Sequence, residues 1–128
     1  MNDGTNMESD GISLNEIMEM SRAFQKSRIF LTAYEMDVFT VLGDEERSSK
    51  EISEAIHADH RGTDRLLNAL CALNILKKVG NKYKNSLVAV RYLVKGKADY
   101  QAGLMHTVHL WNSWDTLTDA VRNGGLVR

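Results

Sequence analysis

Residues 48–84 read SSKEISEAIHADHRGTDRLLNALCALNILKKVGNKYK, and this stretch decides the fold. Ser48 and Glu51 have the spacing of a capping box, which opens a short helix. After a tight connection, Asp59 is a suitable N-cap for a second helix. That helix carries an apolar stripe at helical spacing, made of Leu66, Leu67, Leu70, Cys71 and Leu73. Asn74 follows it and tolerates the left-handed backbone that ends helices. The stretch therefore predicts a helix, a turn and a second helix.

The pattern after the second helix changes from helical spacing to that of strands. Two runs, 75–79 and 82–84, flank Gly80-Asn81, which is a two-residue signal for a β-hairpin turn. Ser86 is expected to cap another short helix over residues 87–93. The order of helix, turn, helix and lysine-bearing hairpin is that of a winged helix. We therefore predict a mainly α fold, a winged helix-turn-helix with a small β-hairpin wing, flanked by long helices.

The segment before this unit predicts a long helical element. Ser13 and Glu16 form a second capping box. Apolar residues then recur at helical spacing, which indicates one long helix or two helices joined near Gln25–Ser27. These residues are Leu14, Ile17, Met18, Phe24, Ile29, Phe30, Ala33 and Tyr34. These helices have apolar residues on more than one face, and few of their positions are wholly polar. We therefore expect them to bury more than one face, and contact with a partner chain is one way to do so.

The last predicted element is one long helix from about Ala98 to Val121, which Gly124-Gly125 ends. Its apolar stripe consists of Leu104, Val108, Trp111, Leu117 and Val121. Trp111 and Trp114 share one face of this helix. Two interpretations remain open for them, packing in the core or a dimer, and the wall of an apolar ligand pocket.

The composition is that of an ordinary globular domain, with 128 residues, 43% hydrophobic, 26% charged and a net charge of −1. The charge is uneven: residues 1–43 carry three bases and seven acids, a net −4, whereas residues 44–97 carry eleven bases and seven acids, a net +4. No apolar stretch approaches the roughly 20 residues that span a bilayer, and the polar, acidic start is not a targeting sequence. We therefore expect a cytoplasmic protein with no membrane partner. Residues 1–12 are expected to be a disordered lead-in to one domain over residues 13–125.

DNA binding is the main alternative that the residues themselves raise, in the form of a stand-alone dimeric winged-helix transcriptional regulator. The second helix would then enter the major groove, and basic side chains would contact phosphates. The wing offers Lys77, Lys78, Lys82 and Lys84. However, Asp59 and Asp64 at the start of the second helix would also face phosphates, and the overall charge gives weak support. Nucleic acid is therefore not expected as a partner.

Metal binding and catalysis find little support in the sequence. His106 and His109 lie one helical turn apart, but no further ligand has a matching spacing. Cys71 lies in an apolar stripe where nothing lowers its pKa, and no glycine-rich phosphate loop is present. We predict no catalytic, cofactor-binding or metal-binding residue in this chain.

Residues 27–125 resemble the N-terminal domain of the plant- and polyketide-type S-adenosylmethionine-dependent O-methyltransferases, a group that includes caffeate and acetylserotonin methyltransferases. The segments that carry the resemblance stand in the family's order: AYEMDVF at 33–39, SKEIS at 49–53, RLLNAL at 65–70 with LNIL at 73–76, YKNS at 83–86, WDTL at 114–117, AVR at 120–122, and Gly124. The most specific of them is the pair within residues 65–76. Asn74 stands where the family usually has glycine, and asparagine holds the same left-handed backbone.

The resemblance implies a homodimer whose first, long dimerisation helices interlock. The residues it places in the dimer interface are Leu14, Ile17, Met18, Phe24, Ile29 and Phe30. It also implies that the domain covers an active site, with substrate-pocket candidates Leu104, Met105, His109 and Arg28. An arginine there would suit an acidic or polar group of the substrate.

The resemblance further implies that the complete enzyme binds S-adenosylmethionine in a separate Rossmann-like domain, where a catalytic histidine also lies. That enzyme would methylate an oxygen of a small hydroxylated substrate, which can be aromatic. We expect the present chain not to be catalytic by itself, and residues 126–128 to begin the linker to the absent catalytic domain.

Overall fold

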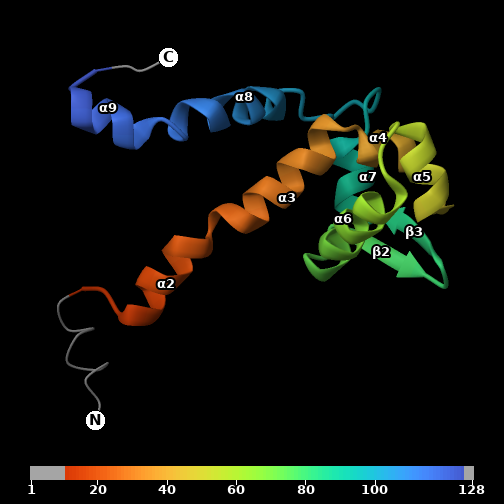
Figure 1. Ribbon diagram of the computed structural model, residues 1–128. Coiled ribbons are helices and arrows are strands. Elements are labelled where there is room, and N and C mark those ends of the chain that lie inside the picture. Colours follow the sequence, from red (N-terminus) through yellow and green to blue (C-terminus); the bar gives the residue numbers. More distant parts are fainter. Residues whose placement is uncertain (1–10, 126–128) are drawn as a thin grey trace, which may run out of the picture.

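Two helical arms project from a winged-helix core in the computed structural model, which describes residues 11–125 (Figure 1). We call α2 and α3 the N-terminal arm, α8 and α9 the C-terminal arm, and the elements between them the core. The predictions for residues 1–10 and 126–128 lie outside the described residues. In chain order the elements are α2 Leu14–Arg22, α3 Phe24–Glu35, α4 Val38–Leu42, β1 Arg47–Ser48, α5 Ser49–Ala55, α6 His60–Ala72, β2 Leu76–Val79, β3 Lys82–Asn85, α7 Leu87–Leu93, α8 Leu104–Trp114 and α9 Leu117–Asn123.

The predicted helix boundaries of the core are confirmed by their caps. The Ser48 side chain accepts from the Glu51 N–H at 3.1 Å, and the Glu51 carboxylate accepts from the Ser48 N–H at 2.8 Å. A reciprocal pair of the same kind opens α2. Asp59 accepts from the Gly62 N–H at 2.8 Å and so starts α6, and Asn74 takes φ 65° just past its end. These caps satisfy backbone groups that a helix leaves unpaired, which is why they locate its ends.

The wing belongs to a three-stranded antiparallel sheet in the order β1-β3-β2. Its hairpin turns at Gly80, which takes φ 63°, and pairs Leu76 with Asn85 and Lys77 with Lys84. The hairpin confirms the prediction, whereas the two-residue strand β1 was not predicted.

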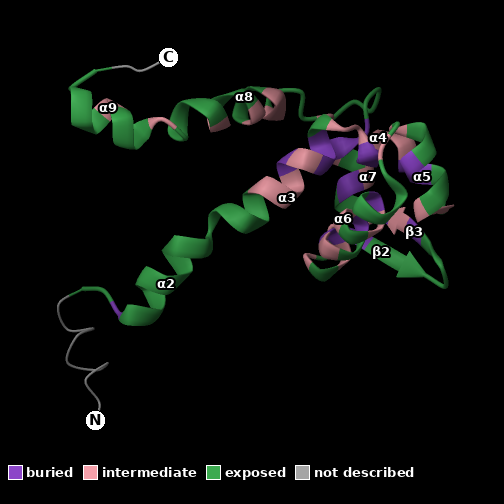
Figure 2. Ribbon diagram, viewed as in Figure 1, coloured by how far each residue is buried: buried purple, intermediate pink, exposed green. Residues whose placement is uncertain are grey.

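The buried residues concentrate in the core and at the adjoining end of α3 (Figure 2). The hydrophobic cluster comprises Ala33, Tyr34, Val38, Phe39, Leu42, Ile52, Leu67, Leu70, Leu76, Tyr83, Ala89 and Leu93. Asn85 is the polar centre of this region, because its amide donates to the carbonyl oxygens of Phe39 at 3.0 Å and Gly43 at 2.9 Å. The amide thereby satisfies two carbonyls where α4 ends, and it joins β3 to that helix.

The structure corrects both predictions for the arms. The first long element is two helices, as one of the alternatives had it, but they meet at Ala23 and not near Gln25–Ser27. The single helix over 98–121 is wrong: residues 98–103 form turns, and a second break separates α8 from α9 at Asp115 and Thr116. At that break the Thr116 hydroxyl donates to a backbone carbonyl three residues earlier, at 2.8 Å, a local bond that competes with helix continuation.

The turns over 98–103 are held by contacts with the core that a sequence pattern does not show. The Tyr34 hydroxyl donates to the Gln101 carbonyl at 2.8 Å, and the Gln101 N–H donates to the Tyr92 carbonyl at 2.9 Å. Among the described residues, none in α2, α8 or α9 is buried. The arms therefore meet the core only near their roots.

Candidate dimer interface and ligand pocket

The apolar side chains of α2 are exposed. The exposed fractions are 64% for Leu14, 48% for Ile17 and 45% for Met18. Phe24, just beyond the helix, is 53% exposed. Among the helices and strands, only α3 makes more than isolated contacts with α2. Four of the six predicted interface residues thus lie on a surface that residues 11–125 leave uncovered.

The other two predicted interface residues lie at the root of the N-terminal arm. Ile29 and Phe30 are half-buried and pack against the hydrophobic cluster. The Phe30 ring centroid lies 5.9 Å from that of Phe39 and 6.2 Å from that of Tyr34. The sequence prediction grouped all six residues together, whereas within one chain Ile29 and Phe30 also stabilise the core.

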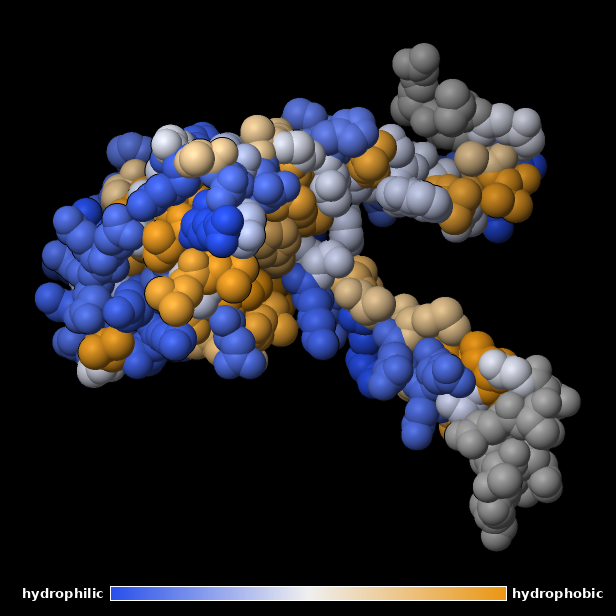
Figure 3. All heavy atoms as spheres, turned by 180° about the vertical axis from the view of Figure 1, so that it is seen from behind, coloured by the Kyte–Doolittle hydropathy of each residue, from blue (hydrophilic) through white to orange (hydrophobic). Residues whose placement is uncertain are grey.

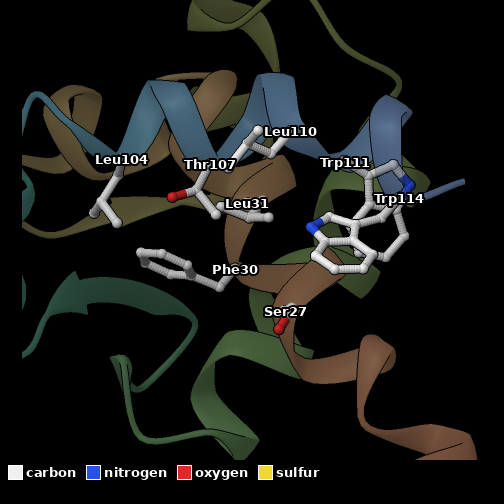
Figure 4. A pocket seen from close by; sticks show the side chains of 8 residues that line it. All are labelled: Ser27, Phe30, Leu31, Leu104, Thr107, Leu110, Trp111 and Trp114. Carbon is white, nitrogen blue, oxygen red and sulfur yellow. The ribbon is translucent and has the colours of Figure 1, made fainter. Parts of the chain in front are cut away.

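An apolar pocket of about 260 Å³ lies between the two arms (Figure 4). Its lining residues come from α3 and α8: Ser27, Phe30, Leu31, Leu104, Thr107, Leu110, Trp111 and Trp114. Both tryptophan rings turn toward this pocket, and Ser27 and Thr107 contribute hydroxyl groups (Figure 4). Trp114 is 69% exposed, so it does not pack in a core formed by the described residues.

Only one of the four substrate-pocket candidates lines this pocket. Leu104 contributes to its wall, whereas Met105 packs against the hydrophobic cluster and His109 is exposed. Sequence reasoning missed Leu31, Thr107 and Leu110, and it assigned Phe30 to the dimer interface alone. On α8 the positions 104, 107, 111 and 114 share one face by helical spacing, and this pattern could have identified Thr107.

Arg28 has its guanidinium group engaged within the chain. It donates to the Thr32 hydroxyl at 3.1 Å and to a Glu35 carboxylate oxygen at 2.8 Å. Its guanidinium carbon lies 5.2 Å from the centroid of the Trp111 ring, a cation–π distance. Arg28 therefore links α3 to α8, and an acidic group of a ligand would have to compete with Glu35 for it.

A chain of hydroxyl groups lies where the C-terminal arm leaves the core. The Tyr100 hydroxyl donates to the Tyr34 oxygen at 2.9 Å, and Tyr34 in turn donates to the Gln101 carbonyl. The two rings stack with an interplanar angle of 6°. Burial, together with the Tyr100 hydroxyl, raises the pKa of Tyr34 well above its ordinary value. Tyr34 therefore stays protonated and serves as a donor.

The start of α6, which would enter DNA in a regulator, uses its polar groups within the fold. The Ser49 hydroxyl oxygen lies 3.0 Å from His60 Nε2, within hydrogen-bond distance. The buried Tyr83 hydroxyl lies 2.9 Å from Asn68 Oδ1 and 3.2 Å from Asp64 Oδ1, which joins the wing to α6. Asp64 thus has a structural role and leaves a negative charge on the face that DNA would meet.

The described residues show neither an activated nucleophile at Cys71 nor a cluster of metal ligands. Burial raises the pKa of the Cys71 thiol, which disfavours the reactive thiolate. Within residues 11–125, no group of three or more histidine, cysteine, aspartate or glutamate side chains is placed to hold a metal ion. No helix in this same range is long and apolar enough to cross a membrane.

The chain resembles methyltransferases in sequence over most of its length. It is 34% identical over 112 residues to the tetracenomycin polyketide synthesis 8-O-methyl transferase of Streptomyces glaucescens. The aligned residues make up 85% of this chain and 33% of that protein. It is 31% identical over 116 residues to the acetylserotonin O-methyltransferase of Gallus gallus, with 84% and 34% covered. The chain thus spans about a third of the length of these relatives.

Solved structures give the same result for the fold. An O-methyltransferase family protein from Burkholderia thailandensis superimposes with a TM-score of 0.76 at 27% identity, over 87% of this chain and 33% of that one. Human N-acetylserotonin methyltransferase, solved in complex with SAM, superimposes with a TM-score of 0.73 at 24% identity, over 84% and 34%. The stand-alone regulator is not favoured by these matches. The model of the O-methyltransferase dimerisation domain matches residues 18–95, more than half of the chain, and the chain belongs to this family.

Proposed function

We propose that this chain is the homodimerisation and substrate-covering domain of an S-adenosylmethionine-dependent O-methyltransferase acting on a small hydroxylated substrate. The observation that carries the proposal is the uncovered apolar surface of the N-terminal arm in a chain of the dimerisation-domain family. The substrate-covering role rests on the apolar pocket between the arms.

A second copy of the chain is the partner that suits α2. α2 has nine residues, none of them buried, and isolated helices shorter than about 12–15 residues are marginal in water. Burying an exposed Leu, Ile, Met or Phe side chain stabilises an interface by roughly 1.5–3 kcal/mol. Leu14, Ile17, Met18 and Phe24 would together stabilise a dimer, and Ile29 and Phe30 would extend the interface toward the core.

The pocket between the arms suits one wall of a substrate site. Its volume of about 260 Å³ lies below the roughly 300–1,000 Å³ of complete ligand sites. An apolar wall with two tryptophan rings suits a flat ring, and the hydroxyls of Ser27 and Thr107 offer hydrogen bonds. We propose that Leu104 contacts the substrate, and that Met105, His109 and Arg28 reach it only if the arms rearrange.

S-adenosylmethionine does not fit the described residues of this chain. Their sheet is antiparallel, a two-residue hairpin turn joins β2 to β3, and no glycine-rich loop separates β1 or β3 from the helix that follows it. We propose that the cofactor binds in the remaining two-thirds that the relatives possess, and that the reaction is transfer of its methyl group to a substrate oxygen.

The homodimer is tested by sedimentation equilibrium on this chain with Ile17→Asp. We expect a dimer for the unsubstituted chain and a dissociation constant at least roughly hundredfold higher for the variant, as for the loss of a central interface residue. The matched control is Asn15→Asp, which adds the same charge to the opposite face of α2 and should leave the constant unchanged. A monomeric unsubstituted chain at micromolar concentration would contradict the proposal.

The substrate-covering role is tested in a protein that carries this domain together with the remaining two-thirds that the relatives possess. Leu104→Glu should raise KM for the substrate roughly tenfold or more, because a charge then faces an apolar ligand. His106→Glu, on a different face of α8, is the control. Unchanged KM in Leu104→Glu would exclude this pocket from the substrate site.

A further inference from the structure

The lining of the pocket between the arms carries no charge. None of its eight residues has an ionisable side chain, and besides the tryptophan N–H groups its polar side-chain groups are the hydroxyls of Ser27 and Thr107. This is not a general property of the N-terminal arm, because hydrophilic and hydrophobic side chains are both exposed along it when the molecule is seen from behind (Figure 3). A charged group of a ligand would lose its hydration in this pocket without gaining a charged partner from the lining.

Arg28 places a cation beside this lining, since its guanidinium carbon lies 5.2 Å from the centroid of the Trp111 ring. That charge is already opposed by Glu35, whose carboxylate accepts from Arg28 Nη2 at 2.8 Å. The Thr32 hydroxyl accepts from Arg28 Nε at 3.1 Å and fixes another donor of the guanidinium. The side chains of Arg28 and Glu35 are 32% and 44% exposed, so solvent screens this pair only in part. A ligand carboxylate beside Trp111 would therefore meet the negative charge of Glu35 together with the guanidinium.

We propose that the pocket selects a flat ring whose polar group is uncharged, such as a phenol, over the same ring bearing a carboxylate, and that Glu35 determines this selectivity through Arg28. The inference rests on the substrate-covering role proposed above and adds to it the charge of the substrate. A phenolic hydroxyl is neutral at pH 7, because the ordinary pKa of such a group is about 10. Glu35 is a positioning residue in this arrangement, because it holds Arg28 and does not itself line the pocket.

The two hydroxyls of the lining fit an uncharged polar group. Ser27 belongs to α3 and Thr107 to α8, so they reach the pocket from opposite arms (Figure 4). A hydroxyl both donates and accepts, so each of them can pair with a phenolic O–H, which does the same. A carboxylate has only acceptors, and two neutral hydroxyls replace the hydration of a full charge poorly.

The selectivity is tested with 2-naphthol and 2-naphthoate, which share one bicyclic ring and differ in charge at pH 7. This chain is titrated with each probe and followed by NMR through its indole N–H signals. Trp111 and Trp114 are the two tryptophans of the sequence, and both line the pocket, so their signals report on it directly. NMR also measures the weak binding that one wall of a site provides. We expect both signals to shift, and 2-naphthol to bind at least about tenfold more tightly than 2-naphthoate.

Glu35→Gln separates the charge of Glu35 from its size and its hydrogen bond to Arg28. We expect this variant to bind 2-naphthoate about tenfold more tightly than the unsubstituted chain does, because the guanidinium charge is then unopposed. Its affinity for 2-naphthol should stay the same. Glu35 is the last residue of α3 and is partly exposed, so folding should persist. The matched control is Glu19→Gln on α2, which removes the same charge outside the pocket lining and should change neither affinity.

The double variant Arg28→Gln/Glu35→Gln tests whether Glu35 acts through Arg28. Without the guanidinium, the gain of Glu35→Gln should disappear, and 2-naphthoate should bind as weakly as it does to the unsubstituted chain. Direct repulsion of the ligand by Glu35 would instead leave the gain in place, because the double variant also lacks that carboxylate.

The outcomes separate the selectivity from the proposed function. Equal affinities of the unsubstituted chain for the two probes, no gain in Glu35→Gln, or a gain that survives in the double variant overturns this inference and leaves the substrate-covering role in place. Indole signals that respond to neither probe overturn both. The homodimer is tested separately by sedimentation equilibrium. A preference for 2-naphthol that Glu35→Gln reduces and the double variant restores supports the inference.

Discussion

The core and the arms use their apolar residues in opposite ways. In the core, Leu67 and Leu70 are fully buried, whereas α9 leaves Val121 75% exposed and α2 leaves Leu14 64% exposed. The core, together with the adjoining end of α3, therefore has the contacts needed to fold as one chain, whereas α2 and α9 have apolar side chains that the rest of residues 11–125 does not cover. This contrast indicates that α4–α7 mainly stabilise the fold, that α2 mainly serves assembly and that α3 contributes to both, and substitutions can test the division.

The largest expected effect is the loss of a core side chain. Leu67→Ala should lower the free energy of unfolding by about 2–5 kcal/mol, because it removes buried methylene and methyl groups and leaves a cavity. Val121→Ala in α9 should change it by less than about 0.5 kcal/mol. Urea denaturation at a fixed chain concentration measures both. Equal effects of the two substitutions would abolish the distinction between core and arm.

A smaller effect is expected at the polar centre of the core. Asn85→Ala should cost about 1–3 kcal/mol, since the carbonyls of Phe39 and Gly43 lose their buried donor. The control is Asn81→Ala in the exposed turn of the wing, for which urea denaturation should give nearly the unsubstituted value. If Asn85→Ala were as mild as its control, the amide would not connect β3 to α4 in solution.

Replacing Asn74, the residue with left-handed backbone after α6, should change the free energy of unfolding by less still. Asn74→Ala should lower the free energy of unfolding by roughly 1–2 kcal/mol, because alanine resists the φ of 65° found there. Asn74→Gly should be neutral or slightly stabilising, since glycine adopts this conformation freely. The pair of variants isolates the backbone effect, and a cost for glycine equal to that for alanine would assign the role to the asparagine side chain.

The smallest effect is expected where the core meets the C-terminal arm, and it depends on pH. The folded state holds the Tyr34 proton more tightly than the unfolded chain does, whose tyrosine pKa is near 10.0. This contribution to stability is therefore complete below about pH 10 and is lost as the pH rises above that value.

Tyr34→Phe should cost about 1 kcal/mol at neutral pH through the lost hydrogen bonds and should make the alkaline fall in stability less steep. Urea denaturation at a series of pH values from neutral to alkaline measures this slope. Tyr92→Phe, a substitution at a half-buried tyrosine of α7, is the matched control. A slope that Tyr34→Phe leaves unchanged would mean that this hydroxyl is not held protonated by the fold.

The sequence predicted the core better than the arms, for a physical reason. Ser48, Asp59 and Asn74 act on backbone groups a few residues away, so their pattern contains the whole interaction. The turns over residues 98–103, which precede α8, are held by the Tyr34 hydroxyl. Tyr34 is 67 residues from its partner Gln101, and no local pattern encodes that bond.

The candidate site shows the same limit. Helical spacing was enough to put Trp111 and Trp114 on one face, but which α3 residues lie opposite them depends on how the two arms pack. The expectation that Arg28 meets a substrate came from the family resemblance and stays a prediction. Its guanidinium pairs with Glu35 and stacks on Trp111, and the second contact also depends on how the arms pack. The two-residue strand β1 is too short to have a pattern and forms because β3 lies beside it.

The lack of buried residues in α2 has a consequence for what a dilute solution of this chain contains. If α2 forms its helix against a second copy, ordering that helix and associating are one equilibrium, and both obey mass action. The helical content of the chain should then rise with its concentration and level off once association is complete. A spectroscopic dilution series would thus report how much chain a cell must hold before this segment has a defined shape.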